Sequence, residues 1–341
     1  MTTLPLRVTA SPPLPPARGD LSGAVIAALR GAAGPLPPAA EVSGADPYGA
    51  DLHLALYLLY ELHYRGFAGI DDAYEWDPAL LRLRADAEDR FLTALRRDAA
   101  AGDNADQALG ELLVEPVGDS GDSMSHHLAR EGALWQVREY AALRSLYHLK
   151  EADPHLWVVP RLRGRAKAAM VAIEYDEYGA GRAERVHAEL FAALMRDLGL
   201  DPAYGRYLDA APAPALATVN LMSLFGLHRS LRGALVGHFA AVEVTSPPAS
   251  RRLAAAMRGV GAGPAAARFY DEHVEADAVH EQVVRHEVVG GLLADEPALA
   301  ADVAFGIGAT AHLEDRLAGE VLTAWRSGDS ALRSPLAGPG D

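Results

Sequence analysis

The stretch from residue 268 to residue 287, RFYDEHVEADAVHEQVVRHE, carries the residues best suited to chemistry. Nothing in it breaks a helix, so we predict one continuous helix. At about 100° per residue, His273, Asp277 and His280 then share one narrow stripe bordered by valines. Two imidazoles and a carboxylate at fixed spacing are nitrogen and oxygen ligands for a transition metal. The alternative is a solvated helix face that happens to carry histidines.

Other polar residues stand in apolar segments and could add ligands. Glu243 follows the apolar run Gly237–Val242, where an unpaired charge would cost several kcal/mol. Glu243 is therefore solvated near a helix end, bound to metal, or paired with a cation. Arg232, which lies on the same helix face three turns earlier, could be that cation. His187 shares a helix face with apolar residues, which is also where a hydrogen-bonded core histidine would lie.

Two acidic positions are ambiguous from the sequence. Glu174 and Glu177 precede the glycines at 179 and 181, which must distort or break the helix. Helical geometry therefore leaves open which of the two carboxylates faces inward. Glu151 follows a helix that ends near Lys150 and could be a ligand or a surface residue. A metal site needs all these residues to converge from separate helices, which spacing cannot show.

Composition limits the kinds of site and partner. The chain has 341 residues, no cysteine and a formal net charge of −15. Without thiolates, a cysteine nucleophile, Cys-bound zinc and iron–sulfur clusters are excluded, so His and carboxylates must hold any metal. The negative charge argues against nucleic acid and anionic membranes. With no apolar run of about 18 residues and no leader-like N-terminus, we expect a cytoplasmic protein.

The elements that must position these residues are helices, and we predict an all-α bundle. Residues 1–45, rich in Pro, Ala and Gly, are expected to form an arm with one short helix at Leu21–Arg30. A single helical domain is expected over 46–330, with its metal-binding core at about 140–290, and a flexible tail over 331–341. Ser246-Pro247-Pro248 should end one helix. The predicted helices include Leu52–Tyr64, Pro78–Ala99, Ala105–Leu113, His126–Lys150, Trp157–Tyr175, Arg182–Leu198, Leu216–Val244 and Pro297–Arg326.

Five sequence motifs follow one another between residues 149 and 280. They are Leu149-Lys-Glu-Ala-Asp-Pro, Glu174-Tyr-Asp-Glu-Tyr-Gly-Ala-Gly, Val186-His-Ala-Glu-Leu-Phe, Arg232-Gly-Ala-Leu-Val-Gly-His and Asp271-Glu-His-Val-Glu-Ala-Asp-Ala-Val-His. In their order and spacing they resemble the heme-oxygenase-like di-iron oxidases and oxygenases, a family of iron-containing redox enzymes. The resemblance covers residues 140–290 and fades before residue 120. It implies a heme-oxygenase-like helical bundle.

The resemblance also implies a ligand set of three histidines and three or four carboxylates around two Fe(II) ions. Glu243 would be the bridging carboxylate, and Glu177, ten residues before His187, fits the family spacing better than Glu174. Ligands of these types suit iron or manganese. O2 would be the co-substrate. Carried over motif by motif, the ligands are Glu151, Glu177, His187, Glu243, His273, Asp277 and His280.

The function implied is a non-heme di-iron oxygenase working through a peroxo-type intermediate. It would N-oxygenate an amine, arylamine or guanidine in natural-product biosynthesis, with a small amine or amino-acid-like substrate and an external electron donor. Family members that cleave C–C bonds share the core ligands, so a di-iron oxidase cleaving or desaturating an amino or fatty acid is the alternative. Glu243 and Arg232 are the expected catalytic residues. Candidates for substrate contacts are Arg229, Arg232, Glu61 and His63.

Rival interpretations come from other classes. A ferritin-like bundle would use Glu184-Arg-Val-His187 and Asp277-Ala-Val-His280, so that Glu184 replaces Glu177 and His273 has no role. A metal-free helical binding protein would use the same polar residues as an internal hydrogen-bond network. Heme binding by a lone His leaves the carboxylates unexplained. The apolar helix Leu52–Tyr64 could form a homodimer face or belong to the core.

Overall fold

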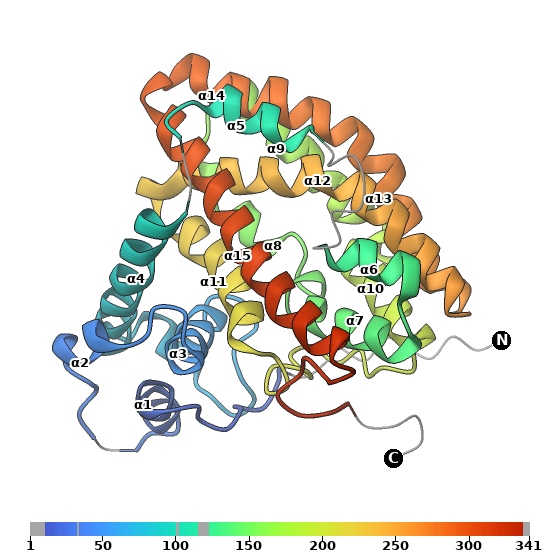
Figure 1. The fold of residues 1–341 in the computed structure, drawn as a ribbon. Coiled ribbons are helices and arrows are strands. Elements are labelled where there is room, and N and C mark those ends of the chain that lie inside the picture. The colour runs from blue at the N-terminus through green and yellow to red at the C-terminus, as the bar shows by residue number, and fades with distance from the viewer. Residues whose placement is uncertain (1–10, 33, 100–101, 115–122, 337–341) are drawn as a thin grey trace.

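The computed structural model describes residues 11–32, 34–99, 102–114 and 123–336, except the side chains of Glu275, Asp277 and Ala278. These residues form helices and contain no strand, which confirms the all-α fold class (Figure 1). The helices are α1 Asp20–Leu29, α2 Ala39–Gly44, α3 Ala50–Glu61, α4 Pro78–Asp98, α5 Ala105–Leu112, α6 Met124–Glu131, α7 Leu134–His148, α8 Asp153–Leu156, α9 Gly164–Glu177, α10 His187–Asp197, α11 Ala213–Leu227, α12 Arg232–Gly259, α13 Pro264–Val283, α14 Gly290–Asp295 and α15 Ala300–Arg326.

Helix α12 lies at the centre of the half of the molecule that carries the candidate ligands. It packs along α13 and α15 and also contacts α6 and α11. In Figure 1 the N-terminal helices α1 to α3, coloured blue, and α4, coloured teal, lie at one end, and α15, coloured red, runs obliquely in front of α11 and α12. None of the described helices combines the length and the apolarity of a membrane span.

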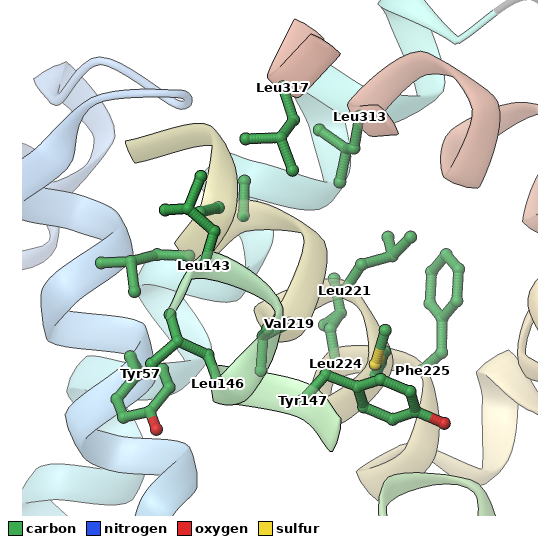
Figure 2. Packing of buried hydrophobic residues seen from close by; sticks show 14 of the residues in the cluster. Tyr57, Leu143, Leu146, Tyr147, Val219, Leu221, Leu224, Phe225, Leu313 and Leu317 are labelled. Carbon is green, nitrogen blue, oxygen red and sulfur yellow. The ribbon is translucent and has the colours of Figure 1, made fainter. Parts of the chain in front are cut away.

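The apolar core is built around α11, which is buried on all sides. Every residue from Pro214 to Gly226 is buried, as expected for a helix that is apolar all round. Figure 2 shows Leu143, Leu146 and Tyr147 of α7 beside side chains of α11. Helix α3 is also buried along nearly its whole length, against α1, α4 and α11. The predicted apolar helix Leu52–Tyr64, which could have formed a dimer face, is therefore part of the core.

Predicted helix ends match the observed ones where a capping residue is present. They differ where contacts between distant segments determine where the helix ends. Asp77 caps α4 by accepting from the N–H groups of Ala79 and Leu80, with Pro78 at the first helical position. The predicted helix Leu216–Val244 is instead two helices, because the chain is extended at His228. At that break Gly226 packs so closely that a Cβ would lie 2.7 Å from the Pro154 carbonyl oxygen.

The expectation that Ser246-Pro247-Pro248 ends a helix is wrong. Helix α12 continues through both prolines to Gly259, although an interior proline costs about 3 kcal/mol. Pro247 is buried, and so are five residues of the helix beyond it, Ser250, Leu253, Ala254, Ala256 and Met257. Apolar burial on that face outweighs the cost of the lost hydrogen bond. Glu243 consequently lies within α12, not at its end.

Other predicted helices are shorter than the apolar pattern suggested. Gly132 separates α6 from α7, and the segment predicted as Trp157–Tyr175 becomes α-helical only at Gly164, after a short 3₁₀ turn at Val159–Arg161. The helix predicted over 268–287 is α13 up to Val283, followed by a π-helical segment, Val284–Val289. Such wide turns occur where a helix accommodates one extra residue.

Part of the predicted N-terminal arm packs against the helical domain. The short helix expected there is α1, whose Val25 and Leu29 are buried and which contacts α3. Asp51 accepts hydrogen bonds from the N–H groups of Leu21 and Ser22. At the other end of the chain, Leu332 is buried. Residues 1–10 of the predicted arm and 337–341 of the predicted tail lie outside the described residues.

Gly237 and Gly306 allow α12 and α15 to touch backbone to backbone. A Cβ at Gly237 would lie 2.0 Å from the Val303 carbonyl oxygen, and one at Gly306 would lie 2.0 Å from that of Ala234. We expect Gly237→Ala to lower the free energy of unfolding by about 3 kcal/mol, because the helices must separate. Gly319→Ala, at a position on α15 with open space around it, should be neutral or raise it by up to about 1 kcal/mol. Urea unfolding of both variants compares the two; equal stabilities would contradict the close contact.

Three fully buried histidines should make the metal-free protein sensitive to acid. Burial lowers the pKa of His53 and of His155 to about 3, and that of His238 to about 4. The unfolded chain binds these protons near pH 6.5. The neutral imidazoles therefore make their full contribution to the free energy of unfolding above pH 6.5. As the pH falls from there towards 4, the free energy of unfolding decreases by up to about 4 kcal/mol per pH unit.

Urea unfolding between pH 7 and pH 5 measures this slope. His53→Gln should reduce the slope by about one proton, because one titrating group is removed. His286→Gln is the matched control, since His286 is exposed and should leave the slope unchanged. Equal slopes for wild type and His53→Gln would contradict burial of a neutral His53.

Candidate metal centre

The candidate ligands converge from five separate segments. Glu151 lies in the turn between α7 and α8, and Glu177 is the last residue of α9. His187 is the first residue of α10, Glu243 lies within α12, and α13 carries the remaining two histidines. Six of the predicted ligands are buried, namely Glu151, Glu177, His187, Glu243, His273 and His280. They form two overlapping groups of possible ligand atoms.

The first group consists of Glu151, Glu177, His187 and His273, with one ligand atom from each lying within 4.8 Å of the others. A carboxylate oxygen of Glu177 is 2.6 Å from His187 Nδ1. His273 Nε2 is 3.9 Å from a carboxylate oxygen of Glu151. Two oxygen and two nitrogen donors at this spacing could surround one metal ion.

The second group consists of Glu177, Glu243 and His280 under the same limit of 4.8 Å. His280 Nδ1 is 3.4 Å from Glu243 and 3.8 Å from Glu177. The carboxylate common to both groups is thus Glu177, whereas the resemblance gave the bridging role to Glu243. The two oxygens of Glu177 face different groups, one towards His187 and the other towards His280.

Hydrogen bonds on the far side of two histidines orient their rings for metal binding. His273 Nδ1 donates to the Phe269 carbonyl oxygen at 2.7 Å, so Nε2 carries the lone pair that faces the first group. His280 Nε2 is 3.3 Å from the Asp176 carboxylate, which leaves Nδ1 for the second group. Such outer partners fix the tautomer and orientation of metal-binding histidines. The residues present therefore fit a pair of metal ions.

A glycine turn brings Glu177 and His187 together. Gly179 has φ of 70°, and a Cβ on it would lie 2.7 Å from the Arg185 carbonyl carbon. Only glycine combines this left-handed conformation with so close an approach. The turn allows α9 to end and α10 to begin with their facing ends side by side. Glu174 and Glu177 are both buried, but only Glu177 belongs to the two groups of possible ligands.

Two buried carboxyl groups beside the centre have opposite electrostatic environments. Burial, together with Glu177 and Glu243, raises the pKa of Glu174 well above its usual value. Burial also opposes ionisation of Glu151, but the nearby His148 and His273 outweigh it and hold its pKa well below the usual range. In the metal-free protein these surroundings therefore favour the ionised form of Glu151 and the protonated form of Glu174.

A cavity of about 60 Å³ adjoins both groups. Its wall includes the candidate ligands Glu151, Glu177, Glu243 and His273, and none of the Lys or Arg residues that the structure describes lines it. The space exceeds the volume that one water needs. Seven further wall residues were not identified from the sequence, although three of them share one face of α12 with Glu243: Tyr147, His148, Ala152, His155, Phe239, Val242 and Ser246.

The residues proposed for substrate contacts are not among those that line the cavity. Arg232, which was also an expected catalytic residue, begins α12, and its Nε lies 3.3 Å from Glu296. It is about 16 Å along the helix from the candidate ligand on α12. His63 pairs with Glu75 at 2.9 Å, and Arg229 is exposed. Glu61 is fully buried and pairs with Lys150.

Asp277 is a predicted ligand of the di-iron centre, and Glu184 is the ligand that only a ferritin-like site requires. Asp277 lies in α13, but its side chain is outside the described residues, so its role as a ligand stays a prediction. Glu184, which a ferritin-like site would need, is exposed and lies in the short 3₁₀ turn Ala183–Arg185. It belongs to neither group of possible ligands.

The sequence matches a known protein family over its central and C-terminal parts. A sequence profile described as iron-containing redox enzyme matches residues 138–315. This range is just over half of the chain and contains every candidate ligand. No curated protein matches the sequence.

Proposed function

The chain belongs to the heme-oxygenase-like family of iron-containing redox enzymes, and we propose that it is an O2-dependent non-heme di-iron oxygenase. The observation that carries this proposal is the pair of buried ligand groups that share Glu177. One group alone would suit many single-ion sites, whereas two that share a carboxylate suit a pair of ions. The ligands would be the seven predicted ones, Asp277 included.

Iron bound at these residues would supply the electrons that activate O2. The protein's own contribution is to hold the ions, to exclude water and to orient a substrate. The carboxylates of Glu151, Glu177, Glu243 and Asp277 would together balance the charge of two Fe(II) ions. Phe239 and Val242 give the cavity an apolar side, which favours an uncharged part of the substrate. Repeated turnover needs an external electron donor.

We further propose that the substrate is an amine, arylamine or guanidine that is N-oxygenated, in a biosynthetic pathway. Tyr147, His155 and Ser246 line the cavity and can exchange hydrogen bonds with a substrate nitrogen. Burial lowers the pKa of His155 to about 3, so its imidazole is neutral and does not repel a cation. Cleavage or desaturation of an amino or fatty acid is the alternative. The carboxylate of such a substrate would find no Lys or Arg among the described residues of the cavity wall.

Anaerobic loading with Fe(II) followed by exposure to O2 tests the proposal. We expect two irons per chain, and oxygen uptake that accelerates with a suitable amine. With ¹⁸O2, the product should gain one labelled oxygen on nitrogen, as measured by mass spectrometry. His187→Ala is the control that should lose iron and oxygen uptake. A folded wild-type protein that retains no stoichiometric iron would favour the metal-free binding protein instead.

Filling the cavity should separate substrate binding from metal binding. Val242 lines the cavity on the face of α12 that carries Glu243. We expect Val242→Phe to keep both irons but to lower substrate turnover about 100-fold, because the substrate is displaced from the reacting position. Val171→Phe, at an exposed position on α9, is the matched control and should leave turnover unchanged. Unaltered turnover in Val242→Phe would exclude this cavity as the substrate site.

A further inference from the structure

A buried ion pair precedes the candidate ligand Glu151 in the chain. The side chain of Lys150 is 2% exposed, and its Nζ lies 3.1 Å from the carboxylate of Glu61, which is 0% exposed. Glu61 is the last residue of α3, a helix that contributes no candidate ligand. Lysine and glutamate are almost never fully buried unless they are paired. The pair therefore joins the α7–α8 turn to a distant helix.

Aromatic residues complete the surroundings of both charges. The Tyr204 hydroxyl lies 2.7 and 2.8 Å from the two carboxylate oxygens of Glu61 and donates to them. Lys150 Nζ lies 4.3 Å from the ring centre of Tyr64 and 5.1 Å from that of Tyr57. These contacts offset part of the cost of removing an ammonium and a carboxylate from water.

The residues on either side of Lys150 are also held by side chains. Arg65, just after α3, donates from its guanidinium to the Leu149 carbonyl oxygen at 2.9 Å and stacks on Tyr204. Glu151 itself contacts His148 Nδ1 at 2.9 Å. Three successive residues in a turn outside the regular helices are thus each fixed by a charged or titratable group. The first two of these contacts come from the end of α3.

We propose that the Lys150–Glu61 pair, assisted by Arg65, is a positioning device that holds Glu151 in the first ligand group. The inference rests on the proposed metal centre. Replacing a buried ion pair by uncharged side chains of similar volume is often neutral for stability or stabilising. A purely structural pair would then be dispensable, whereas a positioning pair would not, because its loss releases the turn that carries Glu151.

The test is Lys150→Met combined with Glu61→Gln, which removes both charges and leaves a side chain that still accepts from Tyr204. Mn(II) is the probe, because it suits these ligands and the free ion is counted by its EPR signal. Wild type should bind two Mn(II) per chain. In the double variant one ion should bind about 10 to 100-fold more weakly, the usual effect of losing an outer partner. The other ion should keep its affinity, and the melting temperature should change little. Glu151→Gln should weaken the same single ion.

Arg144 and Glu314 supply the matched control. They join α7 to α15 through contacts of 2.8 and 2.6 Å, and neither lies in the turn that carries Glu151. Arg144→Met with Glu314→Gln should leave both Mn(II) affinities unchanged. Arg65→Met is a second, independent variant, which removes only the contact with the Leu149 carbonyl oxygen and should weaken the same ion.

The outcomes distinguish failure of the positioning role from failure of the metal centre. A folded Lys150→Met, Glu61→Gln protein with two wild-type Mn(II) affinities would overturn the positioning role. Equal weakening of Mn(II) binding at both sites would also overturn it. If that variant fails to fold, an Arg65→Met protein with wild-type affinities overturns it. A wild-type protein that binds no Mn(II) would instead refute the metal centre on which the inference rests.

Discussion

Glu177→Ala should remove both metal ions at once. Its carboxylate belongs to both ligand groups, with one oxygen 2.6 Å from His187 and the other 3.8 Å from His280. Loss of an outer partner already weakens metal binding by about 10 to 100-fold. Loss of a donor shared by two ions should therefore weaken both by more than about 100-fold. Iron counted after anaerobic loading and desalting measures the effect.

Two further variants make this result specific to the shared position. His280→Ala removes a donor of the second group alone and should leave one iron per chain. Glu174→Gln, one turn before Glu177, replaces a buried carboxyl that belongs to neither group and should leave two. If Glu177→Ala retained one iron with unchanged affinity, the two groups would not share this carboxylate, and Glu243 would become the better candidate for the bridge.

His273→Ala and Glu184→Ala should have opposite effects, and their comparison decides between the di-iron oxygenase and a ferritin-like site. His273 is buried in the first group, whereas Glu184 is exposed. We expect His273→Ala to lose the iron of that group and to reduce oxygen-dependent turnover by at least about 100-fold. Glu184→Ala should retain both irons and full turnover. Iron content and oxygen uptake, measured on the same samples, provide the comparison.

The reverse pattern would support the rival. A ferritin-like arrangement uses a carboxylate three residues before each histidine, so it requires Glu184 and gives His273 no role. The control for folding is the melting temperature of each metal-free variant, because an alanine at a buried histidine also removes packing contacts. Retained iron in His273→Ala with lost iron in Glu184→Ala would exclude the centre described here.

Much of the helical fold follows from sequence periodicity, but its interruptions do not. The predicted helix Pro78–Ala99 matches α4 to within one residue, because a strong cap and an amphipathic pattern agree there. The break between α11 and α12 was missed, since both helices are apolar on either side of it. The passage of α12 through Pro247 and Pro248 was also missed. Both features depend on packing between distant segments, which local propensity cannot report.

The candidate site was predicted through motif resemblance, with limited help from helical geometry. Spacing within α13 placed His273 and His280 on one face. Only the folded chain shows that His187 and Glu151 lie against them. The choice between Glu174 and Glu177 depends on a glycine turn whose shape cannot be read from composition. The contact of Lys150 with Glu61 joins residues far apart in the chain and has no signature in the sequence.

The position of Asp176 makes the two halves of the centre unequal towards solvent. Asp176 contacts His280, and 55% of its side chain is exposed. The corresponding outer partner of His273 is the Phe269 carbonyl oxygen, which belongs to a residue that is 1% exposed. An ion bound beside His280 would thus lie one residue away from bulk water, and the group there offers fewer described donors. We expect a chelator to extract that ion first, so that the pair empties, and refills, in a fixed order.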